Sequence, residues 1–268
     1  ILRDWSDGIL LEAEAIDKER GVIEEEWRTR NNPILRQIED NAPVIYAGDK
    51  YADCMPIGNM DVVRNCPYDT LRSYYNTWYR PDLQGIVVVG DIDVKRTEEK
   101  IKELFASAKV PEGAPERVYF PVSGYKEPCI VISADAETPF TLLTYSQKVD
   151  DIPDSLKSTE EGLKQAFIRE LASSMLSDRL SDVMKEAEPP FVGANAYYGD
   201  FLLSGKQKCF EIGAQVSNAG AEVAFTRLME EVERMRRFGF TQDELERAKK
   251  SYLALLEQIY NHRDQHEN

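Results

Sequence analysis

Histidine is nearly absent from this chain of 268 residues, and the only two, His262 and His266, lie in the polar stretch NHRDQH at its C-terminal end. Their i, i+4 spacing could hold a zinc ion on one face of a helix, with Asp264 or Glu267 as a further ligand. The stretch lacks a glutamate at the position that a general base would need, so we expect a solvated helix end. With both histidines terminal and no G-x-S-x-G motif, a serine or cysteine triad is not expected either.

Basic charge and long apolar runs are also scarce. The chain holds 33 basic against 48 acidic residues, which gives a formal net charge of −15. This excess argues against a nucleic-acid surface and against docking on anionic lipid, and it suits cationic or neutral partners. No stretch approaches the roughly 18 to 20 continuous apolar residues of a membrane span. No G-x-x-x-x-G-K-[ST] occurs, which excludes a P-loop.

Paired cysteines are missing as well. The four cysteines, Cys54, Cys66, Cys129 and Cys209, include no C-x-x-C, which excludes the usual zinc-ribbon and thioredoxin arrangements. No secretory context is visible, so we expect free, buried thiols rather than disulfides.

Hydrophobic periodicity divides the first part of the chain into helices and one strand. The run GIVVVGD, residues 85–91, is continuous and β-branched, which predicts a strand buried on both faces. Apolar residues at helical spacing predict helices over 8–30, 34–47, 67–79 and 97–107, with a loop over 48–58. In the fourth helix the inward residues are Ile101, Leu104 and Phe105. In the third helix, core packing explains the aromatic cluster at least as well as ligand stacking does; its members are Tyr74, Tyr75, Trp78 and Tyr79.

A proline-rich stretch, residues 110–121, predicts a boundary between two domains. We place the C-terminal part of a first domain at 1–112, a linker at 113–121 and a second, homologous domain at 122–268. Beyond the linker we expect strands over 128–135 and 140–149, a helix over 158–187 and a hairpin of 191–201 with 208–217. Two helices should follow, one from Asn218 or Gly220 to about 238 and one over 241–260. Strands in blocks and helices in blocks indicate an α+β fold of two layered domains, each a mostly antiparallel or mixed sheet packed with helices.

Local signals within the second domain are more specific. Thr241 and Glu244 form the S/T-x-x-E pattern of a capping box at a helix start. In YYGDF, we expect Gly199 at positive φ in a hairpin turn rather than a binding motif. The long helix should turn its apolar stripe inward, namely Leu163, Phe167, Leu171, Met175 and Leu180.

The first predicted helix carries acidic residues that separate on a helical wheel. Glu12, Glu19 and Glu26 recur every seven residues along one shoulder of the buried face. Glu19 and Glu26 lie about 10.5 Å apart along the axis at 1.5 Å per residue, so they cannot both ligate one ion. The apolar positions fall within a sector of about 80°; they are Ile9, Ala13, Ile16, Ile23 and Trp27.

Glu26 is the member of this triplet that should be partly desolvated. It falls between Ile23 and Val22 on the wheel, whereas Glu25 points away from the buried face and Glu24 lies on the opposite, polar shoulder. A partly buried carboxylate needs a cation, a donor or a proton. On composition alone, a solvated stripe that pairs with basic side chains elsewhere is favoured over a metal or catalytic role.

The segment KERGVIEEEWR resembles a stretch of the insulinase/pitrilysin zinc metallopeptidases that follows their inverted H-x-x-E-H motif. In that family, an E-R-x-x-x-x-x-E helix supplies the third zinc ligand at its final glutamate and an auxiliary glutamate seven residues earlier. The match makes Glu26 the metal ligand and Glu19 the auxiliary catalytic acid. The segment from Asp61 to Phe105, with its Tyr-x-Pro corner and V-V-V-G-D strand, is similar to the same family, and 122–268 resembles its second domain.

The sequence departs from the family by containing no H-x-x-E-H at all. We expect that the chain is an excerpt that starts downstream of this motif, rather than a member without it. The resemblance implies that two histidines of the absent helix and Glu26 hold Zn²⁺, that the absent glutamate deprotonates a bound water, and that Glu19 acts from outside the ligand shell. This chain alone should bind no zinc and should hydrolyse nothing by that mechanism, because one ligand without a base is not enough.

The resemblance thus implies part of a metalloendopeptidase for peptides or small unfolded proteins. Its expected partners are a peptide substrate and a second homologous half or subunit that closes a chamber, with the bacterial periplasm or cell envelope favoured over the cytoplasm. A non-catalytic scaffold or partner subunit of the same fold is the alternative, and an independent peptide-binding module is a third.

Overall fold

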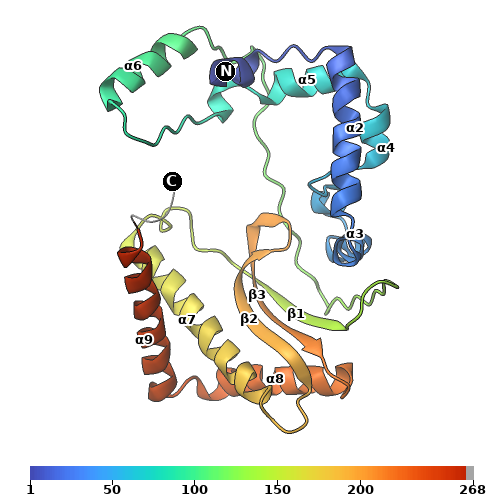
Figure 1. Cartoon of the computed structure of the whole chain (residues 1–268), viewed down its shortest axis with the longest axis vertical. Helices are drawn as coiled ribbons and strands as arrows, with labels where there is room; N and C mark the ends of the chain where they lie inside the picture. Colours follow the sequence, from blue (N-terminus) through green and yellow to red (C-terminus); the bar gives the residue numbers. More distant parts are fainter. Residues whose placement is uncertain (264–268) are drawn as a thin grey trace. The chain divides into compact units, whose positions relative to one another are not determined.

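The computed structural model describes residues 1–263, without the side chain of Lys206, and combines helices with one antiparallel sheet (Figure 1). This α+β composition confirms the predicted fold class. Contacts divide the chain into two compact units, residues 1–39 with 53–120 and residues 40–52 with 121–268. The homologous domains proposed at 1–112 and 122–268 stay a prediction.

Residues 1–120 contain only helices as regular elements. The predicted helix over 8–30 is wrong at its start, because Leu11 adopts a left-handed conformation with φ 50° that interrupts it. Ile9 consequently lies outside the helix. Side chains cap two later helices: Asn59 accepts hydrogen bonds at the start of α4, and Asp93 does so at the start of α6. In chain order the elements are α1 Leu2–Asp7, α2 Ala13–Arg30, α3 Pro33–Ile45, the 3-10 helix Lys50–Asp53, α4 Met60–Asn65, α5 Tyr68–Trp78, the 3-10 helix Pro81–Leu83 and α6 Val94–Phe105.

The predicted buried strand over 85–91 is wrong. The segment has no strand partner among residues 1–263, and Val87 and Val89 are 85% and 82% exposed. The strand predicted over 128–135 fails in the same way, with Ile130 and Ile132 exposed. A β-branched run forms a strand only when a neighbouring chain accepts and donates its backbone hydrogen bonds, and apolar composition does not supply that neighbour.

Amide hydrogen exchange should separate these runs from the true sheet. In the 268-residue chain, the amides of 86–89 should exchange at close to the rate of an unstructured peptide, because no strand protects them. The amides of 212–214, in the central strand of the sheet, should be protected. Exchange measured by mass spectrometry tests this, and equal protection of the two segments would contradict the unpaired conformation.

The second unit is built around a three-stranded sheet in the order β1-β3-β2, with both pairs antiparallel. The predicted hairpin is confirmed as β2 with β3, but its turn is at Leu202, where φ is 48°, and not at Gly199. Gly199 instead pairs with Cys209 inside the sheet. The strands are β1 Leu142–Val149, β2 Phe191–Phe201 and β3 Ser204–Val216, and the helices are α7 Glu160–Val183, α8 Ala221–Phe238 and α9 Gln242–Asn261.

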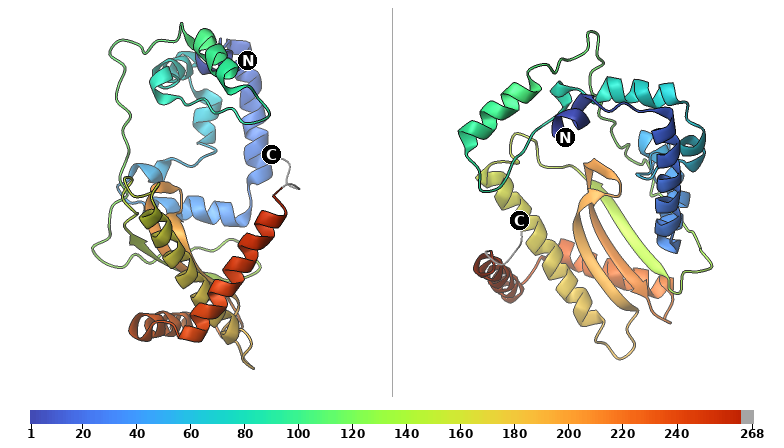
Figure 2. Two further views of the ribbon diagram at one scale, coloured as in Figure 1. Left: turned by 90° about the vertical axis from the view of Figure 1, so that its left-hand side faces the viewer. Right: turned by 45° about the horizontal axis from the view of Figure 1, so that its top comes forward.

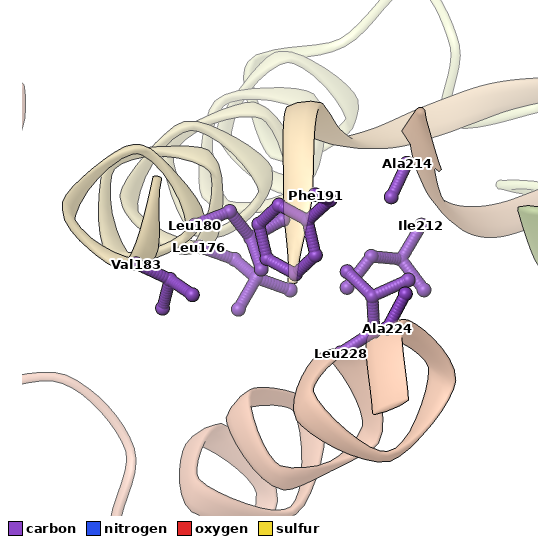
Figure 3. Close-up of a cluster of buried hydrophobic side chains, with 8 residues drawn as sticks. All are labelled: Leu176, Leu180, Val183, Phe191, Ile212, Ala214, Ala224 and Leu228. Atoms are coloured by element: carbon purple, nitrogen blue, oxygen red, sulfur yellow. The ribbon is translucent and has the colours of Figure 1, made fainter. Parts of the chain in front are cut away.

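Helices α7 and α8 cover one face of this sheet. Ile212 and Ala214 alternate inward along β3 and pack with Leu176 and Leu228 of the two helices (Figure 3). Helix α7 follows the length of the sheet, with α9 beside it (Figures 1 and 2). The inward stripe predicted for α7 is correct at Met175 and Leu180 and wrong at its first turn, where Leu163 is exposed.

A smaller cluster lies on the opposite face of the same sheet. Cys209, an odd number of positions from Ile212, is buried there with Tyr46 and Phe201. Tyr46 donates a hydrogen bond to the Phe201 carbonyl at 3.0 Å and accepts one from the Leu203 amide at 3.1 Å. The segment 40–52 thereby closes the hairpin end of the sheet.

The four cysteines are free, as predicted, but they are not all buried. Cys54 and Cys129 are exposed, and Cys66 is half-buried. Burial raises the pKa of the Cys209 thiol to about 11, which makes it unreactive. Exposure of the others follows from their place in loops and at a helix end, which composition does not reveal.

Candidate functional site

Helix α2 carries both residues of the predicted site, Glu19 and Glu26. Glu12 is its N-cap residue, Glu12 and Glu19 are exposed, and Glu26 is half-buried. The predicted difference in burial within the triplet is therefore confirmed. Ile16 is the buried residue of the apolar stripe, while Ile23 is half-buried beside Glu26.

The Glu26 carboxylate is held by its own helix. Its Oε1 lies 2.7 Å from Arg30 Nη2, in an i, i+4 pair whose side chains are 42% and 69% exposed. An exposed pair of this kind contributes about 0 to 1 kcal/mol, so a stronger cation can displace Arg30 at little cost. The carboxylate is thus accessible, and its charge is only weakly compensated.

Glu25 and Glu24 differ in a way that the wheel does not show. Glu25 pairs with Arg28 at 2.7 Å on the exposed side of α2, the outward orientation that the wheel predicts. Glu24 instead pairs with Arg64 of α4, accepting from its Nε at 3.1 Å and also from its Nη2. The hydrogen bond to Glu24 raises the pKa of Arg64. Glu24 therefore contributes to helix docking, which its place on the polar shoulder of the wheel does not predict.

A second cross-helix contact is centred on Arg20, which the sequence reasoning did not single out. Arg20 Nη2 donates to the Cys66 carbonyl at 2.6 Å, and Nη1 donates to the Val63 carbonyl. Its Nε donates to Asp17 at 3.2 Å, and Tyr68 donates to the other Asp17 oxygen at 2.8 Å. The i, i+3, i+7 spacing of positions 17, 20 and 24 is the signal that marks this docking face.

The donor set tests whether a metal fits. Within residues 1–263, no three histidine, cysteine, aspartate or glutamate residues lie close enough together to hold an ion. The donors present therefore do not complete a zinc site, and Glu26 fits the role of one carboxylate ligand at most. Glu19, seven positions earlier, lies about 10.5 Å away along the helix axis, too far to join it.

The remaining candidates do not form sites. His262 ends α9 exposed, with Nδ1 2.8 Å from the Gln258 carbonyl, which is the solvated helix end expected; His266, Asp264 and Glu267 lie outside the described residues. In the aromatic cluster, Tyr75 is buried and its hydroxyl donates to the Trp5 carbonyl at 3.1 Å, while Tyr74 and Tyr79 are exposed. Packing explains Tyr75 and its contact with the Tyr79 ring, whose centroid lies 4.8 Å away, whereas Tyr74 does not lie in the core.

These features define an α+β domain in which helices cover one face of an antiparallel sheet and an acidic helix precedes the sheet in sequence. A family model described as the peptidase M16 inactive domain matches residues 65–252. The chain belongs to this peptidase family, and the resemblance to insulinase/pitrilysin peptidases is confirmed.

Similar proteins agree with this assignment. The chain is 26% identical over 262 residues to the probable zinc protease PqqL of Haemophilus influenzae, and 28% identical over 263 residues to that of Escherichia coli, covering 97% and 96% of this chain. The crystal structure of the periplasmic protease PqqL from Escherichia coli matches 99% of this chain with a TM-score of 0.83 at 23% identity, which shows the fold.

The chain spans 28% and 27% of the length of the two relatives, and 29% of the solved protease. None of the helices in residues 1–263 combines the length and the hydrophobicity that a bilayer crossing requires.

Proposed function

We propose that this chain is part of a zinc-dependent metalloendopeptidase that cleaves peptides or small unfolded proteins, and that it supplies one metal ligand. The observation that carries the proposal is the accessible Glu26 carboxylate on α2, at the final position of the E-R-x-x-x-x-x-E segment. The relatives that match almost the whole chain are described as zinc proteases, which supports the choice of metal.

Glu26 binds the ion in this proposal, after its contact with Arg30 is released. Glu26 and two histidines outside this chain would hold the zinc, which would supply Lewis-acid chemistry for peptide hydrolysis. Glu19 lies about two turns away on the same shoulder of α2, and its charge would orient or balance the site without touching the ion. The general base in this proposal is the glutamate of an H-x-x-E-H motif, which this sequence does not contain.

The partners follow from the same family. A peptide substrate would be enclosed between this half and a second homologous half or subunit. A periplasmic or cell-envelope location is proposed because the solved relative from Escherichia coli is described as periplasmic.

Testing starts with the chain as it is. The 268-residue chain, dialysed against zinc, should retain no stoichiometric metal and should not cleave unstructured peptides, because one ligand without a base is insufficient. Metal analysis and a fluorogenic peptide assay measure both. Stoichiometric zinc together with hydrolysis would show that the chain holds a complete site of its own.

A non-catalytic scaffold or partner subunit is the second candidate. It is favoured by the description of the matching family model, which is an inactive domain. Reading the encoded sequence some tens of residues upstream of Ile1 separates the two. An H-x-x-E-H there supports the peptidase, and its absence supports the scaffold.

A further inference from the structure

We infer that Arg20 is a positioning residue for the glutamate face of α2, because its guanidinium fixes the rotation and the axial register of that helix against α4 and α5. The role assigned toward the metal rests on the proposed function of Glu26, whereas the helix geometry does not.

Arg20 contacts the C-terminal end of α4. Arg20 Nη1 and Nη2 donate to the carbonyls of Val63 and Cys66, three residues apart in the last turn and the C-cap of α4. Carbonyls at a helix C-terminus have no partner within the helix, and a cation there also meets the negative end of the helix dipole. The Arg20 side chain is only 18% exposed. The contact therefore satisfies groups that water reaches poorly.

Arg20 also contacts the start of α5, through Asp17 and through the Tyr68 ring. Arg20 Nε donates to Asp17, whose other oxygen accepts from the hydroxyl of Tyr68, the first residue of α5. The guanidinium carbon of Arg20 lies 5.7 Å from the centre of the Tyr68 ring, within range of a cation–π interaction. One arginine thus ties α2 to two neighbouring helices at once. If α2 rotated or slid along its axis, these contacts could not all be kept.

Glu26 lies on a different side of α2 from Arg20 and Asp17. At 100° per residue, Glu26 lies about 120° around the helix from Arg20 and about 180° from Asp17. Slipping α2 by one residue would rotate the glutamate face by about 100° and shift it by about 1.5 Å. Arg20 therefore aims Glu19 and Glu26 away from α4 and α5 while never touching either carboxylate.

Lysine cannot replace this contact. The two carbonyls are reached by two different guanidinium nitrogens while Nε reaches Asp17. An ammonium group offers three donors from one point on a flexible stem, without the planar fork. We expect Arg20→Lys to restore the charge but not the geometry.

The experiment uses a protein in which an H-x-x-E-H helix precedes this chain, with Arg20→Ala and Arg20→Lys as variants. Arg28→Ala is the matched control, because Arg28 is 71% exposed and pairs within α2. Spin labels at Lys18 on α2 and Val62 on α4, both exposed, report the helix contact through dipolar broadening. Competition with a chelator reports zinc affinity.

The expected result is a loss of defined dipolar broadening and a roughly 10- to 100-fold weaker zinc affinity in Arg20→Ala, the range seen when groups that orient a ligand are removed. Arg20→Lys should lose both in part, and Arg28→Ala neither. Should Arg20→Ala fail to fold, Arg20→Lys alone decides between positioning and no effect.

Two results would overturn the inference. Unchanged broadening in Arg20→Ala would show that Arg20 does not fix α2. A second contrary result is lost broadening with unchanged zinc affinity, in a protein where Glu26→Gln abolishes zinc binding. It would show that the position of α2 against α4 does not affect how Glu26 binds zinc. If Glu26→Gln keeps its zinc, the proposed function fails by itself, and the broadening still decides whether Arg20 holds the helix.

Discussion

Replacing Glu26 with glutamine, in a protein that also carries the H-x-x-E-H helix, should abolish zinc retention together with peptidase activity. Glutamine has nearly the same size as glutamate but lacks the negative charge with which the carboxylate binds zinc. Loss of a direct ligand should exceed the roughly 10- to 100-fold effect of groups that only orient ligands. Metal analysis after gel filtration and a peptide-cleavage assay measure the two consequences separately.

Glu25→Gln is the matched control. Glu25 is the adjacent residue with the same side chain, and it is 63% exposed in a pair with Arg28, so its variant should keep both zinc and activity. Glu24 is unsuitable as a control, because it binds Arg64 across to α4. Equal losses in the Glu25 and Glu26 variants, or no loss in either, would contradict the assignment of Glu26.

Local periodicity predicted the exposure of Glu25 and the half-burial of Glu26, but not the half-burial of Glu24, and the reason is geometric. Residues on one helix keep fixed angles to each other, so the half-burial of Glu26 and the exposure of Glu19 follow from the sequence alone. The partner of Glu24 does not follow, because Arg64 is forty positions away. The role of Arg20 was missed for the same reason, although its spacing from Asp17 and Glu24 marks a common face.

Strand prediction shows the same limit. The hairpin of β2 and β3 was predictable because its two strands are close in sequence. Its inward residues pack against α7 and α8. The run over 85–91 is the more hydrophobic pattern, yet it has no partner strand in the described part of the chain. Composition gives the tendency of a segment to form a strand, and pairing depends on residues that the pattern does not contain.

The junction of α7, α8 and α9 depends on a contact between residues close in sequence and on a second contact between distant residues. The capping box of Thr241 and Glu244 was predicted and is formed. Its glutamate also binds Arg179 of α7, with Nε to Oε1 at 2.6 Å and Nη2 to Oε2 at 3.0 Å. Arg179 Nη2 donates to the Gly239 carbonyl as well, at 2.9 Å. One buried arginine thereby joins the end of α8 and the start of α9 to α7.

Arg179→Ala should therefore destabilise the chain strongly. Arg179 and Glu244 have side chains that are 8% and 15% exposed, and removal of one member of a buried pair costs about 3 to 5 kcal/mol because the other charge loses its partner. Arg236→Ala is the control, since Arg236 is 65% exposed in a pair with Glu233 on its own helix and should cost less than about 1 kcal/mol. Urea unfolding followed by circular dichroism measures both, and similar midpoints in the two variants would contradict the importance of the buried pair.

The same pair should make stability depend on acid. The hydrogen bond from Arg179 is the largest of the effects that lower the pKa of Glu244 from 4.5 to about 2. A carboxyl whose pKa is lower in the folded state stabilises it above the unfolded pKa, and this contribution disappears as the pH falls from about 4.5 toward 2. A shift of this size corresponds to roughly 3 kcal/mol. The free energy of unfolding of Glu244→Gln should thus be lower at pH 6 and should fall less steeply between pH 4.5 and pH 2 than that of the unchanged chain. Parallel curves for the two proteins would show that the ionised Glu244 is not what Arg179 stabilises.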